Sequence, residues 1–524
     1  MFSEETDTHV RGPSRDGDAV SSPLTARVRS LVDLVRARVE EAGARPAYTW
    51  IEGGEETGEL AYGELDRRAR PQAVTIAARA GPGDRALRLF PPGLDFITAF
   101  LGCLYAGVVA VPAYPPRRNR GLERLAAIVA DTRPRLVLTT EKLAPRIAGW
   151  VEQAGIEAAI VAADGVGLEA AERWRDPGIA ADTLAFLQYT SGSTSTPKGV
   201  MVRHGNLLHN EEMIRRAFGQ TAESVIVSWL PLYHDMGLIG GVLQPLYLGA
   251  RCILTSPLSF LQNPLSWLSA IDRYRGTTSG GPDFGYALCV RKVPDEERQR
   301  LDLSSWTVAF NGSEPVRAET LDAFARAFEP AGFSKRAFYP CYGLAEATLF
   351  VTGGEIASEP PVLEVRASAL GRHRVEGGVE GDSRRLIGCG RVWLDQDVAI
   401  VDPETGTPCG PGVVGEIWVA GPSVAGGYWG KPEETGRDFG AVPAGGDRKY
   451  LRTGDLGFLD GGELYVTGRL KDLIILRGRN YYPHDFERTA EAAHPALRPG
   501  CSAAFTIEDG GEERLVVVQE VDPR

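Results

Sequence analysis

Apolar and polar positions alternate between two periods along most of this chain. Residues 24–42 repeat with the period of a helix and carry Arg and Glu on the outer face. Farther along, short apolar runs of the strand type alternate with helix-like segments. We predict strands at residues 85–90, 108–111, 136–138, 184–189, 199–202, 225–227 and 307–310, and helices at 94–105 and 122–132. This alternation predicts an α/β fold, in which helices pack on sheets.

The pattern changes near residue 386, where short strand-like pieces are separated by Gly and Pro turns. These pieces, which predict a small antiparallel barrel or sheet, lie at residues 398–401, 416–419 and 463–466. Before them, a segment at about 355–385 is rich in Glu, Arg and Gly. One alternating stretch within it predicts an inserted surface hairpin. A turn at residues 468–472 precedes a new apolar run and predicts a domain boundary.

Composition narrows the possible classes of function. The chain has 524 residues, of which 43% are hydrophobic and 24% charged, as in soluble globular proteins with more than one domain. Its net charge of −12 argues against nucleic-acid binding and against an anionic membrane surface. The longest apolar stretch, residues 100–114, is too short for membrane insertion. Residues 1–22 are polar and acidic, which predicts a disordered lead-in without a signal peptide.

The cysteines indicate a compartment. Seven are scattered along the chain without a CxxC pair, so neither a disulfide framework nor a metal cage is expected. We therefore predict free thiols and a cytoplasmic protein.

The most informative motif follows the strand predicted at 184–189. Five hydroxyl side chains lie between Thr190 and Pro197, and Lys198 stands beside Gly199. Rotatable hydroxyls, unobstructed backbone N–H groups and one positive charge make a flexible grip for a polyphosphate. The order differs from that of a P-loop, in which the lysine follows the glycine. The competing interpretation is a Ser/Thr-rich linker, which the strand-like runs on both sides disfavour.

Four further motifs supply groups that the activation of a carboxylic acid by ATP requires. They lie at residues 229–238, 311–315, 342–348 and 453–457. The reaction brings two anions together, so it needs cations, a metal and close positioning. His234 could meet a carboxylate, although a structural histidine is the commoner interpretation of that residue alone. Tyr342 could stack on a base, and Glu346 could hold Mg²⁺. Asp455 in a tight turn, with Arg469 beyond it, suits a ribose diol.

In this order and spacing, the five motifs resemble those of the adenylate-forming (acyl-activating) enzyme superfamily, from about residue 25 to the last residue. The resemblance implies an α/β fold with a large N-terminal domain of two α/β subdomains plus a small β-barrel, at residues 23–470. A partial α+β C-terminal domain would follow at residues 471–524. The implied reaction joins a carboxylate to the AMP part of MgATP, releases pyrophosphate and then passes the acyl group to a thiol. ATP and Mg²⁺ are the implied cofactors.

The resemblance also implies roles for individual residues. It assigns the β- and γ-phosphates of ATP to Thr190, Ser191, Gly192, Ser193, Thr194 and Lys198. It places the adenine among Gly312, Ser313, Glu314, Tyr342 and Gly343, and the ribose at Asp455 and Arg469. Glu346, assisted by Thr194, would bind Mg²⁺. His234 would sit beside the acyl carboxylate and the α-phosphate, and Lys471 would be the hinge of the small domain. The expected catalytic residues are His234, Lys198 and Glu346.

Within the superfamily, the chain is most similar to the fatty acyl-AMP ligases. The similarity rests on Ser195 in the hydroxyl-rich loop, on residues 230–238 and 280–284, and on the insertion at about 355–385. Such an insertion is expected to restrain the small domain and to disfavour coenzyme A. The acyl group would then go to the phosphopantetheine of an acyl carrier protein, in lipid, polyketide or lipopeptide biosynthesis. The implied tunnel for the fatty acid is lined by His234, Met236, Ile239, Gly240, Phe284 and Leu349.

Other interpretations remain open at the level of sequence. No lysine follows Lys471, whereas the superfamily carries its adenylation lysine in a later loop, so we expect a shortened chain that forms adenylate slowly. The competing classes are a fatty acyl-CoA synthetase, an amino-acid adenylating domain and a non-catalytic acyl or nucleotide binder. Asp283 is the one residue that could meet the ammonium group of an amino acid.

Overall fold

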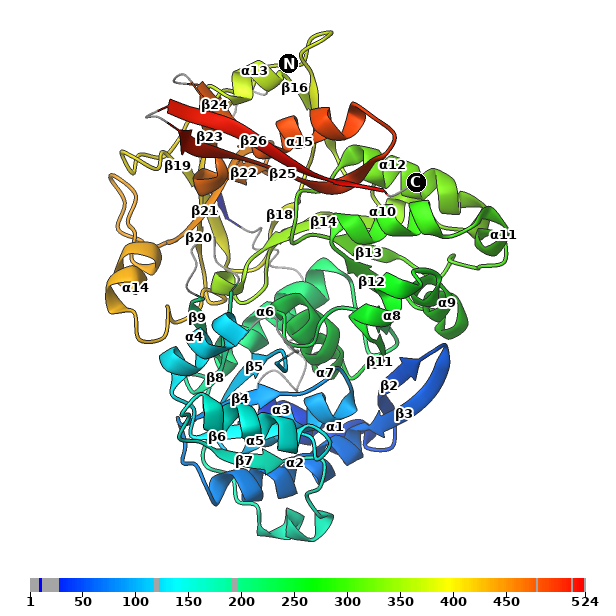
Figure 1. The fold of residues 1–524 in the computed structure, drawn as a ribbon, viewed down its shortest axis with the longest axis vertical. Coiled ribbons are helices and arrows are strands. Elements are labelled where there is room, and N and C mark those ends of the chain that lie inside the picture. Colours follow the sequence, from blue (N-terminus) through cyan, green and yellow to red (C-terminus); the bar gives the residue numbers. More distant parts are fainter. Residues whose placement is uncertain are drawn as a thin grey trace.

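The computed structural model describes residues 9–11, 28–116, 122–190, 197–476, 479–509 and 512–522. Its three larger sheets have six, nine and five strands. In Figure 1 the helices and strands of residues 62–162, coloured blue and cyan, lie toward one end of the long axis, and the C-terminal hairpin, coloured red, lies at the other. The α/β architecture expected from the sequence is confirmed.

The first sheet has six strands and lies at the end of the molecule opposite the C-terminal hairpin (Figure 1). In the order β7-β6-β4-β5-β8-β9, its strands are Ala159–Ala162, Leu136–Thr139, Arg85–Leu89, Val109–Ala113, Leu184–Tyr189 and Gly199–Arg203. Neighbouring strands are parallel except for β8 and β9. The helices of this part are α1 (Leu31–Ala42), α2 (Tyr62–Ala77), α3 (Leu94–Tyr105), α4 (Leu122–Thr132) and α5 (Ala144–Gln153).

The second sheet has nine strands and forms the middle of the molecule. In the order β18-β15-β14-β13-β12-β10-β11-β2-β3, its strands are Arg391–Val392, Phe350–Gly353, Phe338–Gly343, Val308–Asn311, Thr278–Gly281, Val225–Ser228, Arg251–Thr255, Pro46–Glu52 and Glu55–Ala61. Its centre is parallel, and its outer pairs are antiparallel. The associated helices are α6 (His204–Ala217), α7 (Gln244–Leu248), α8 (Pro257–Gln262), α9 (Leu265–Tyr274), α10 (Asp283–Lys292), α11 (Asp295–Arg298) and α12 (Ala318–Phe328).

The third sheet is antiparallel and occupies the region for which a small barrel was expected. In the order β1-β19-β20-β21-β22, its strands are His9–Arg11, Asp397–Val401, Gly415–Ala420, Leu451–Asp460 and Glu463–Arg469. Strand β1 falls inside the segment predicted to be a disordered lead-in. It pairs with β19 because even a short polar segment can satisfy the backbone groups of an edge strand. Helix α14 (Pro432–Phe439) connects β20 to β21.

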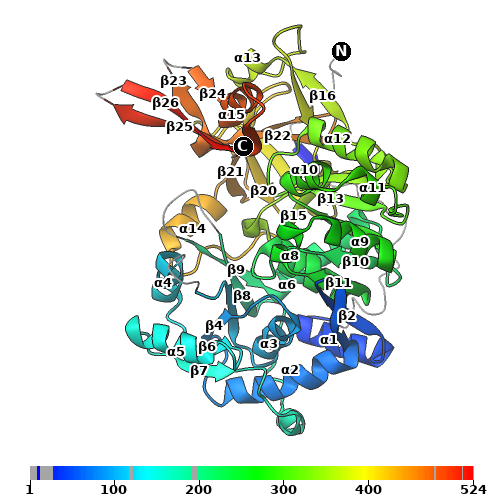
Figure 2. The same ribbon diagram turned by 45° about the vertical axis from the view of Figure 1, so that its right-hand side comes forward.

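The inserted hairpin and the C-terminal segment meet beside this antiparallel sheet. The insertion pairs β16 (Val362–Val365) with β17 (Arg384–Ile387) and carries α13 (Ala367–Leu370). The C-terminal elements are β23 (Ile474–Leu476), β24 (Arg479–Tyr481), α15 (Pro483–Ala492), β25 (Leu497–Asp509) and β26 (Glu512–Val521). Figure 2 shows β25 and β26 projecting from the end of the molecule opposite α2. In the part of the chain that the structure describes, no helix is long and apolar enough to cross a membrane.

The two parallel-rich sheets position the functional site. Strands β5, β8, β13 and β14 end on the same cavity, because the residues at or just after their carboxyl ends form its wall. The carboxyl ends of parallel strands are where α/β proteins commonly bind ligands. One apolar cluster joins α1, α2 and α3 to β10, β11 and the segment at residues 238–250.

Candidate active site

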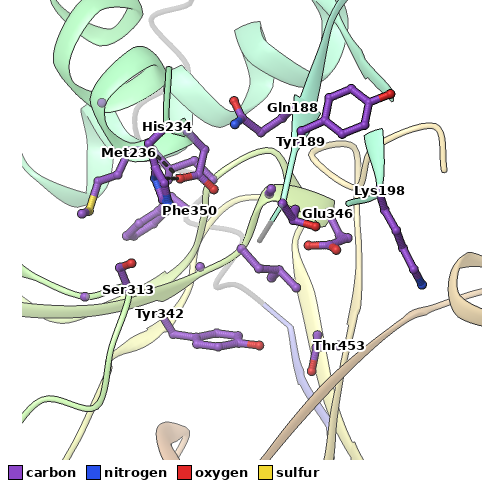
Figure 3. Close-up of a pocket in the computed structure, with 18 of the residues that line it drawn as sticks. Gln188, Tyr189, Lys198, His234, Met236, Ser313, Tyr342, Glu346, Phe350 and Thr453 are labelled. Carbon is purple, nitrogen blue, oxygen red and sulfur yellow. Dashed lines mark hydrogen bonds and ion pairs between the residues drawn. The ribbon is translucent and has the colours of Figure 1, made fainter. Parts of the chain in front are cut away.

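One large cavity, of about 1010 Å³, contains most of the residues singled out from the sequence. Its walls divide into two chemically different sides. The polar side is defined by Lys198, Glu346, Tyr342, Asp455 and Arg469. The apolar side is defined by Ile214, Phe218, Met236, Gly240, Phe310, Leu349 and Phe350. In the view of Figure 3, Met236 and Phe350 lie at one side, Glu346 lies centrally and Lys198 lies at the other side.

Lys198 is held by acidic residues of α14. Its Nζ lies 2.5 Å from Oε2 of Glu434 and 3.8 Å from Oδ2 of Asp438. It also stands over the Tyr428 ring, 4.5 Å from the centroid. Thr190 lines the cavity, and its N–H donates to the Lys198 carbonyl at 3.2 Å. The hydroxyl-rich residues predicted between them, Ser191, Gly192, Ser193 and Thr194, lie outside the described residues.

Glu346 lies in a short 3₁₀ turn, Ala345–Ala347, which directly follows β14 and Leu344. Its Oε1 accepts a hydrogen bond from the Tyr428 hydroxyl at 3.0 Å. Burial raises the pKa of Glu346, and the carboxylates of Asp235 and Asp455 raise it further. Among the described residues, no group of three or more His, Cys, Asp and Glu side chains is arranged to hold a metal ion. A single carboxylate suits Mg²⁺, which usually takes one or two and completes its shell with water and phosphate.

Asp455 and Arg469 are brought together by strand pairing. They are directly opposite each other in β21 and β22, and Arg469 Nε donates to Asp455 Oδ1 at 3.2 Å. The other carboxylate oxygen accepts from the Tyr342 hydroxyl at 2.7 Å. Burial raises the pKa of Asp455 against the attraction of Arg469. Gly454, just before it, has φ of +73°, a conformation that glycine adopts without strain.

The segment predicted for adenine is only partly on the cavity wall. Gly312, Ser313 and Gly343 line the cavity, and a Cβ at Gly343 would come within 1.9 Å of the Leu349 carbonyl oxygen. This close approach of two backbones excludes any side chain there. Glu314 does not line the cavity, because its Oε1 accepts from the backbone N–H of Phe284 at 2.6 Å.

His234 lies where the polar and apolar sides meet. Its Nδ1 is 2.5 Å from Oδ1 of Asp235, and half of its side chain is exposed. Burial alone would lower the pKa of His234, but the neighbouring Asp235 carboxylate outweighs it and raises the pKa above its ordinary value. The next residues form a π-helical segment, η2 (Met236–Leu243), which runs directly into α7.

Three of the five further residues predicted for the fatty-acid tunnel line the cavity: Met236, Gly240 and Leu349. Ile239 does not, because it points into the core and is fully buried. Phe284 does not either, because it lies at the start of α10 with its ring against Trp229, at 5.9 Å between centroids. Its side chain is 41% exposed.

Asp283, the residue that could meet the ammonium group of an amino-acid substrate, also does not line the cavity. Its carboxylate accepts from Asn311 Nδ2 at 3.1 Å, from Thr320 Oγ1 at 2.7 Å and from the Arg317 N–H at 3.2 Å. With these partners in place, it ties α10 to the residues around α12. It is therefore not placed to receive an ammonium group in the cavity.

Sequence reasoning missed several residues at the site. Asp438 lines the cavity, and Glu434, the other partner of Lys198, lies one helical turn before it. Their spacing by four on an amphipathic helix alone predicts only a solvated face. Phe218 and Phe310 stack at 6.1 Å, and Phe218 meets Phe350 edge-on at 5.8 Å. These aromatic residues come from separate elements, so only the assembled fold brings them together.

The predicted hinge is at the edge of the cavity. Lys471 lines it and lies in a 3₁₀ turn, η6 (Leu470–Asp472). The inserted hairpin contacts the segment that follows: His373 Nε2 and Asn480 Nδ2 share a hydrogen bond at 2.9 Å. The guanidinium of Arg384 stands 5.4 Å over the Tyr482 ring. The insertion therefore packs on both sides of the hinge, with Leu470 and Leu473 in the same apolar cluster.

Comparison with known proteins agrees with this geometry. The AMP-binding enzyme family matches residues 35–429. The chain is 46% identical over 505 residues to the medium-chain-fatty-acid–[acyl-carrier-protein] ligase JamA of Moorena producens, covering 94% of this chain and 85% of that protein. It is 39% identical over 526 residues to the ligase TtuA of Teredinibacter turnerae, which is described in the same words, covering 91% of this chain and 82% of that protein.

A solved structure gives the same result. The fatty acyl-adenylate ligase from L. pneumophila, solved in complex with acyl adenylate and pyrophosphate, has a TM-score of 0.83 and 46% sequence identity, covering 95% of this chain and 87% of that chain. The fatty acid AMP ligase from Legionella pneumophila, also 46% identical, has a TM-score of 0.82, covering 95% of this chain and 86% of that chain. The chain therefore belongs to the AMP-binding enzyme family and, within it, to the fatty acyl-AMP ligases.

Proposed function

We propose that this protein activates a fatty acid with ATP to give fatty acyl-adenylate and pyrophosphate, and then passes the acyl group to the phosphopantetheine thiol of an acyl carrier protein. The observation that carries the proposal is one cavity whose polar side meets an apolar side at His234. A polyphosphate nucleotide fits the first and an alkyl chain fits the second. The reacting carboxylate and α-phosphate would then meet at the junction.

On the polar side, each residue has a separate task. Lys198 gives its positive charge to the β- and γ-phosphates, together with the hydroxyl-rich loop that precedes it. Asp455 accepts hydrogen bonds from both ribose hydroxyls, with Arg469 and Tyr342 fixing the orientation of its carboxylate. Gly312, Ser313 and Gly343 leave room for the flat base. Positioning of this kind supplies most of the catalysis in phosphoryl chemistry.

Glu346 is the described residue that would hold Mg²⁺, with Thr194 assisting. The ion, when bound, neutralises phosphate charge and so eases the approach of the fatty-acid carboxylate. Because burial raises the pKa of Glu346, protons compete with the ion for its carboxylate up to a higher pH than for an ordinary glutamate.

His234 reduces the electrostatic repulsion between the fatty-acid carboxylate and the α-phosphate. Its raised pKa keeps the imidazolium form to higher pH than in an ordinary histidine. A cation at the junction stabilises the carboxylate as it approaches the α-phosphate and the negative charge that develops there. Asp235 positions the ring through Nδ1, so that Nε2 is left for the substrates.

The insertion supports transfer to a carrier protein. Its contacts with Asn480 and Tyr482 tie it to the segment after Lys471, which restricts the rotation that coenzyme A would require. We also propose a cytoplasmic location, which the seven free cysteine thiols support.

The test is mass-spectrometric detection of acyl-AMP from ATP, Mg²⁺ and fatty acids of graded chain length. Acyl-AMP should form with fatty acids and not with amino acids. A second assay offers the preformed adenylate to holo-acyl carrier protein and to coenzyme A, and only the carrier protein should be acylated. Equal transfer to coenzyme A would instead identify an acyl-CoA synthetase, and binding without adenylate would identify a non-catalytic protein.

A further inference from the structure

Strand β21 carries Asp455 on a bulge at the edge of the cavity. Where β20 and β21 pair, three residues of β21, 453–455, lie opposite the single residue Ile417 of β20. A bulge takes backbone groups out of the strand ladder and turns the side chains that it carries in a new direction. The direction of the Asp455 carboxylate therefore depends on the groups that hold this bulge in place.

Glu416, the residue before Ile417 on β20, holds the bulge from the neighbouring strand. Its Oε1 accepts a hydrogen bond from the Gly454 N–H at 3.0 Å. Its Oε2 accepts from Arg452 Nε at 2.9 Å and from Trp418 Nε1 at 2.9 Å, and Nη2 of Arg452 lies 2.8 Å from the same oxygen. One carboxylate thus binds both the residue just before the bulge and the residue at its centre.

The Glu416 carboxylate has more effect on geometry than on stability. Glu416 lines the cavity but is only 2% exposed, and a buried ion pair loses much of its attraction to the cost of desolvation. A carboxylate has two acceptor oxygens and an amide only one. Glutamine at this position would therefore point an N–H at a second donor, on either Gly454 or Arg452. No side chain of the same shape except a carboxylate satisfies both.

The predicted ribose site is one residue away from this hydrogen bond. Asp455 follows Gly454 directly, and its carboxylate is the group that we assign to both ribose hydroxyls. Glycine has a wider choice of backbone angles than other residues, so loss of the bond from its N–H would let the bulge settle elsewhere. A shift of the carboxylate weakens its bonds to the ribose, because hydrogen bonds depend steeply on geometry. The 2′-hydroxyl is the group by which ATP differs from 2′-deoxy-ATP.

We propose that Glu416 is a positioning residue for the nucleotide: by holding Gly454, it fixes Asp455 where its carboxylate meets the 2′-hydroxyl of ATP, and so sets the preference for ribonucleotides. The inference rests on the proposed function, because it assigns the origin of nucleotide specificity at the same site.

The experiment compares ATP with 2′-deoxy-ATP at a fixed concentration of fatty acid. Two quantities are measured for each nucleotide: kcat/KM for formation of the acyl-adenylate or its deoxy analogue, and the dissociation constant by calorimetry. A site that bonds a substrate hydroxyl rejects the analogue without it, so the unaltered protein should favour ATP by about tenfold or more in both ratios. Asp455→Ala should abolish the preference and gives the lower limit.

Glu416→Gln should reduce the preference for ATP to about threefold or less, through a higher KM for ATP and an unchanged KM for the fatty acid. Glu416→Asp is a milder second variant, because it keeps the charge beside Arg452 but is one methylene too short to reach Gly454 as well. It should also reduce the preference.

Asp397→Asn is the matched control on the same sheet. Asp397 lies on β19, is 1% exposed and accepts from Arg448 Nη1 at 2.9 Å, but it does not line the cavity. Loss of this buried ion pair should leave the preference for ATP as it is in the unaltered protein. Because each preference is a ratio within one protein, a general loss of folded or active protein cancels.

A preference that survives unchanged in Glu416→Gln, or in Glu416→Asp where only that variant folds, would overturn the inference. So would an equal fall in Asp397→Asn, or equal use of both nucleotides by the unaltered protein. Acyl-AMP formation together with any of these results would overturn this inference alone. Preferential binding of ATP without any acyl-AMP would count against the proposed function, and a binding preference that falls in the Glu416 variants would still support the role of Glu416.

Discussion

The polar and apolar sides of the cavity are built from different kinds of structure. The polar side comes from strand ends and tight turns, where neighbouring charges hold each other: Asp455 with Arg469, and Lys198 with Glu434. The apolar side comes from an irregular helical segment and from aromatic residues on separate elements. A single substitution should therefore alter the binding and use of one substrate, ATP or the fatty acid, and leave those of the other unchanged. Substitutions on each side test this separation.

The largest effect is expected for Lys198→Ala. Removing one preorganised charge from a phosphate site commonly costs about 100-fold to 1000-fold in rate. We expect kcat/KM for ATP to fall by about this amount in steady-state kinetics, while the dissociation constant of the fatty acid stays within about twofold. Lys431→Ala is the control, because its Nζ lies 4.0 Å from Glu434 but the residue does not line the cavity. A parallel loss of fatty-acid binding would show that the two sides are coupled.

The next effect is a pH dependence carried by Glu346. Burial raises the pKa of its carboxyl group, so the proton stays on to higher pH and competes with Mg²⁺. We expect KM for MgATP to rise as pH falls through that raised pKa, by up to about tenfold per pH unit. Glu346→Gln should give a high KM with little pH dependence.

Glu463→Gln is the control for this pH dependence. Glu463 also has a pKa raised by burial, but its Oε1 accepts from the Gly390 N–H and the residue does not line the cavity. Its KM profile should match that of the unaltered protein. An unchanged profile in Glu346→Gln would remove Glu346 from the metal site.

The same contrast explains what the sequence could predict. Strand–helix alternation and turn residues predict the sheets well; the helix expected at residues 122–132 is α4. The residues of the polar side could also be predicted, because residues such as Asp455 and Glu346 combine a charge with a glycine-rich or aromatic motif. Their spacing along the chain is fixed by strands and turns of standard geometry.

The apolar side could not be predicted in the same way. In a π-helical segment the hydrogen bonds run from i to i+5, so the usual period does not decide which residues point inward. Gly240 lines the cavity and its neighbour Ile239 is in the core. Phe284 belongs to a suitable motif but packs on Trp229 instead. Apolar residues carry no directional signal, so only the assembled fold distinguishes wall from core.

A smaller effect is expected for Gly240→Leu on the apolar side. A Cβ at this position would lie 3.6 Å from Leu349 Cδ2, an ordinary contact, so a side chain can be added but must occupy the cavity. We expect kcat/KM for long fatty acids to fall about tenfold relative to short ones, with KM for ATP unchanged. Leu349→Ala should shift the preference toward longer acids. Chain-length profiles of acyl-AMP formation measure both, and identical profiles would place the alkyl chain elsewhere.

The smallest effect concerns the acidic residue that holds Lys198. Side-chain hydrogen bonding to Lys198 lowers the pKa of Glu434, so Glu434 is an anion that competes with phosphate for the same ammonium group. Because the pair is partly exposed and screened, we expect Glu434→Gln to lower KM for ATP by only about threefold. The gain should shrink at high salt. Glu433→Gln, with the same charge change one exposed position earlier, should have no effect. A higher KM in Glu434→Gln would show instead that Glu434 positions Lys198 for the nucleotide. The ion pair would then assist ATP binding on the polar side.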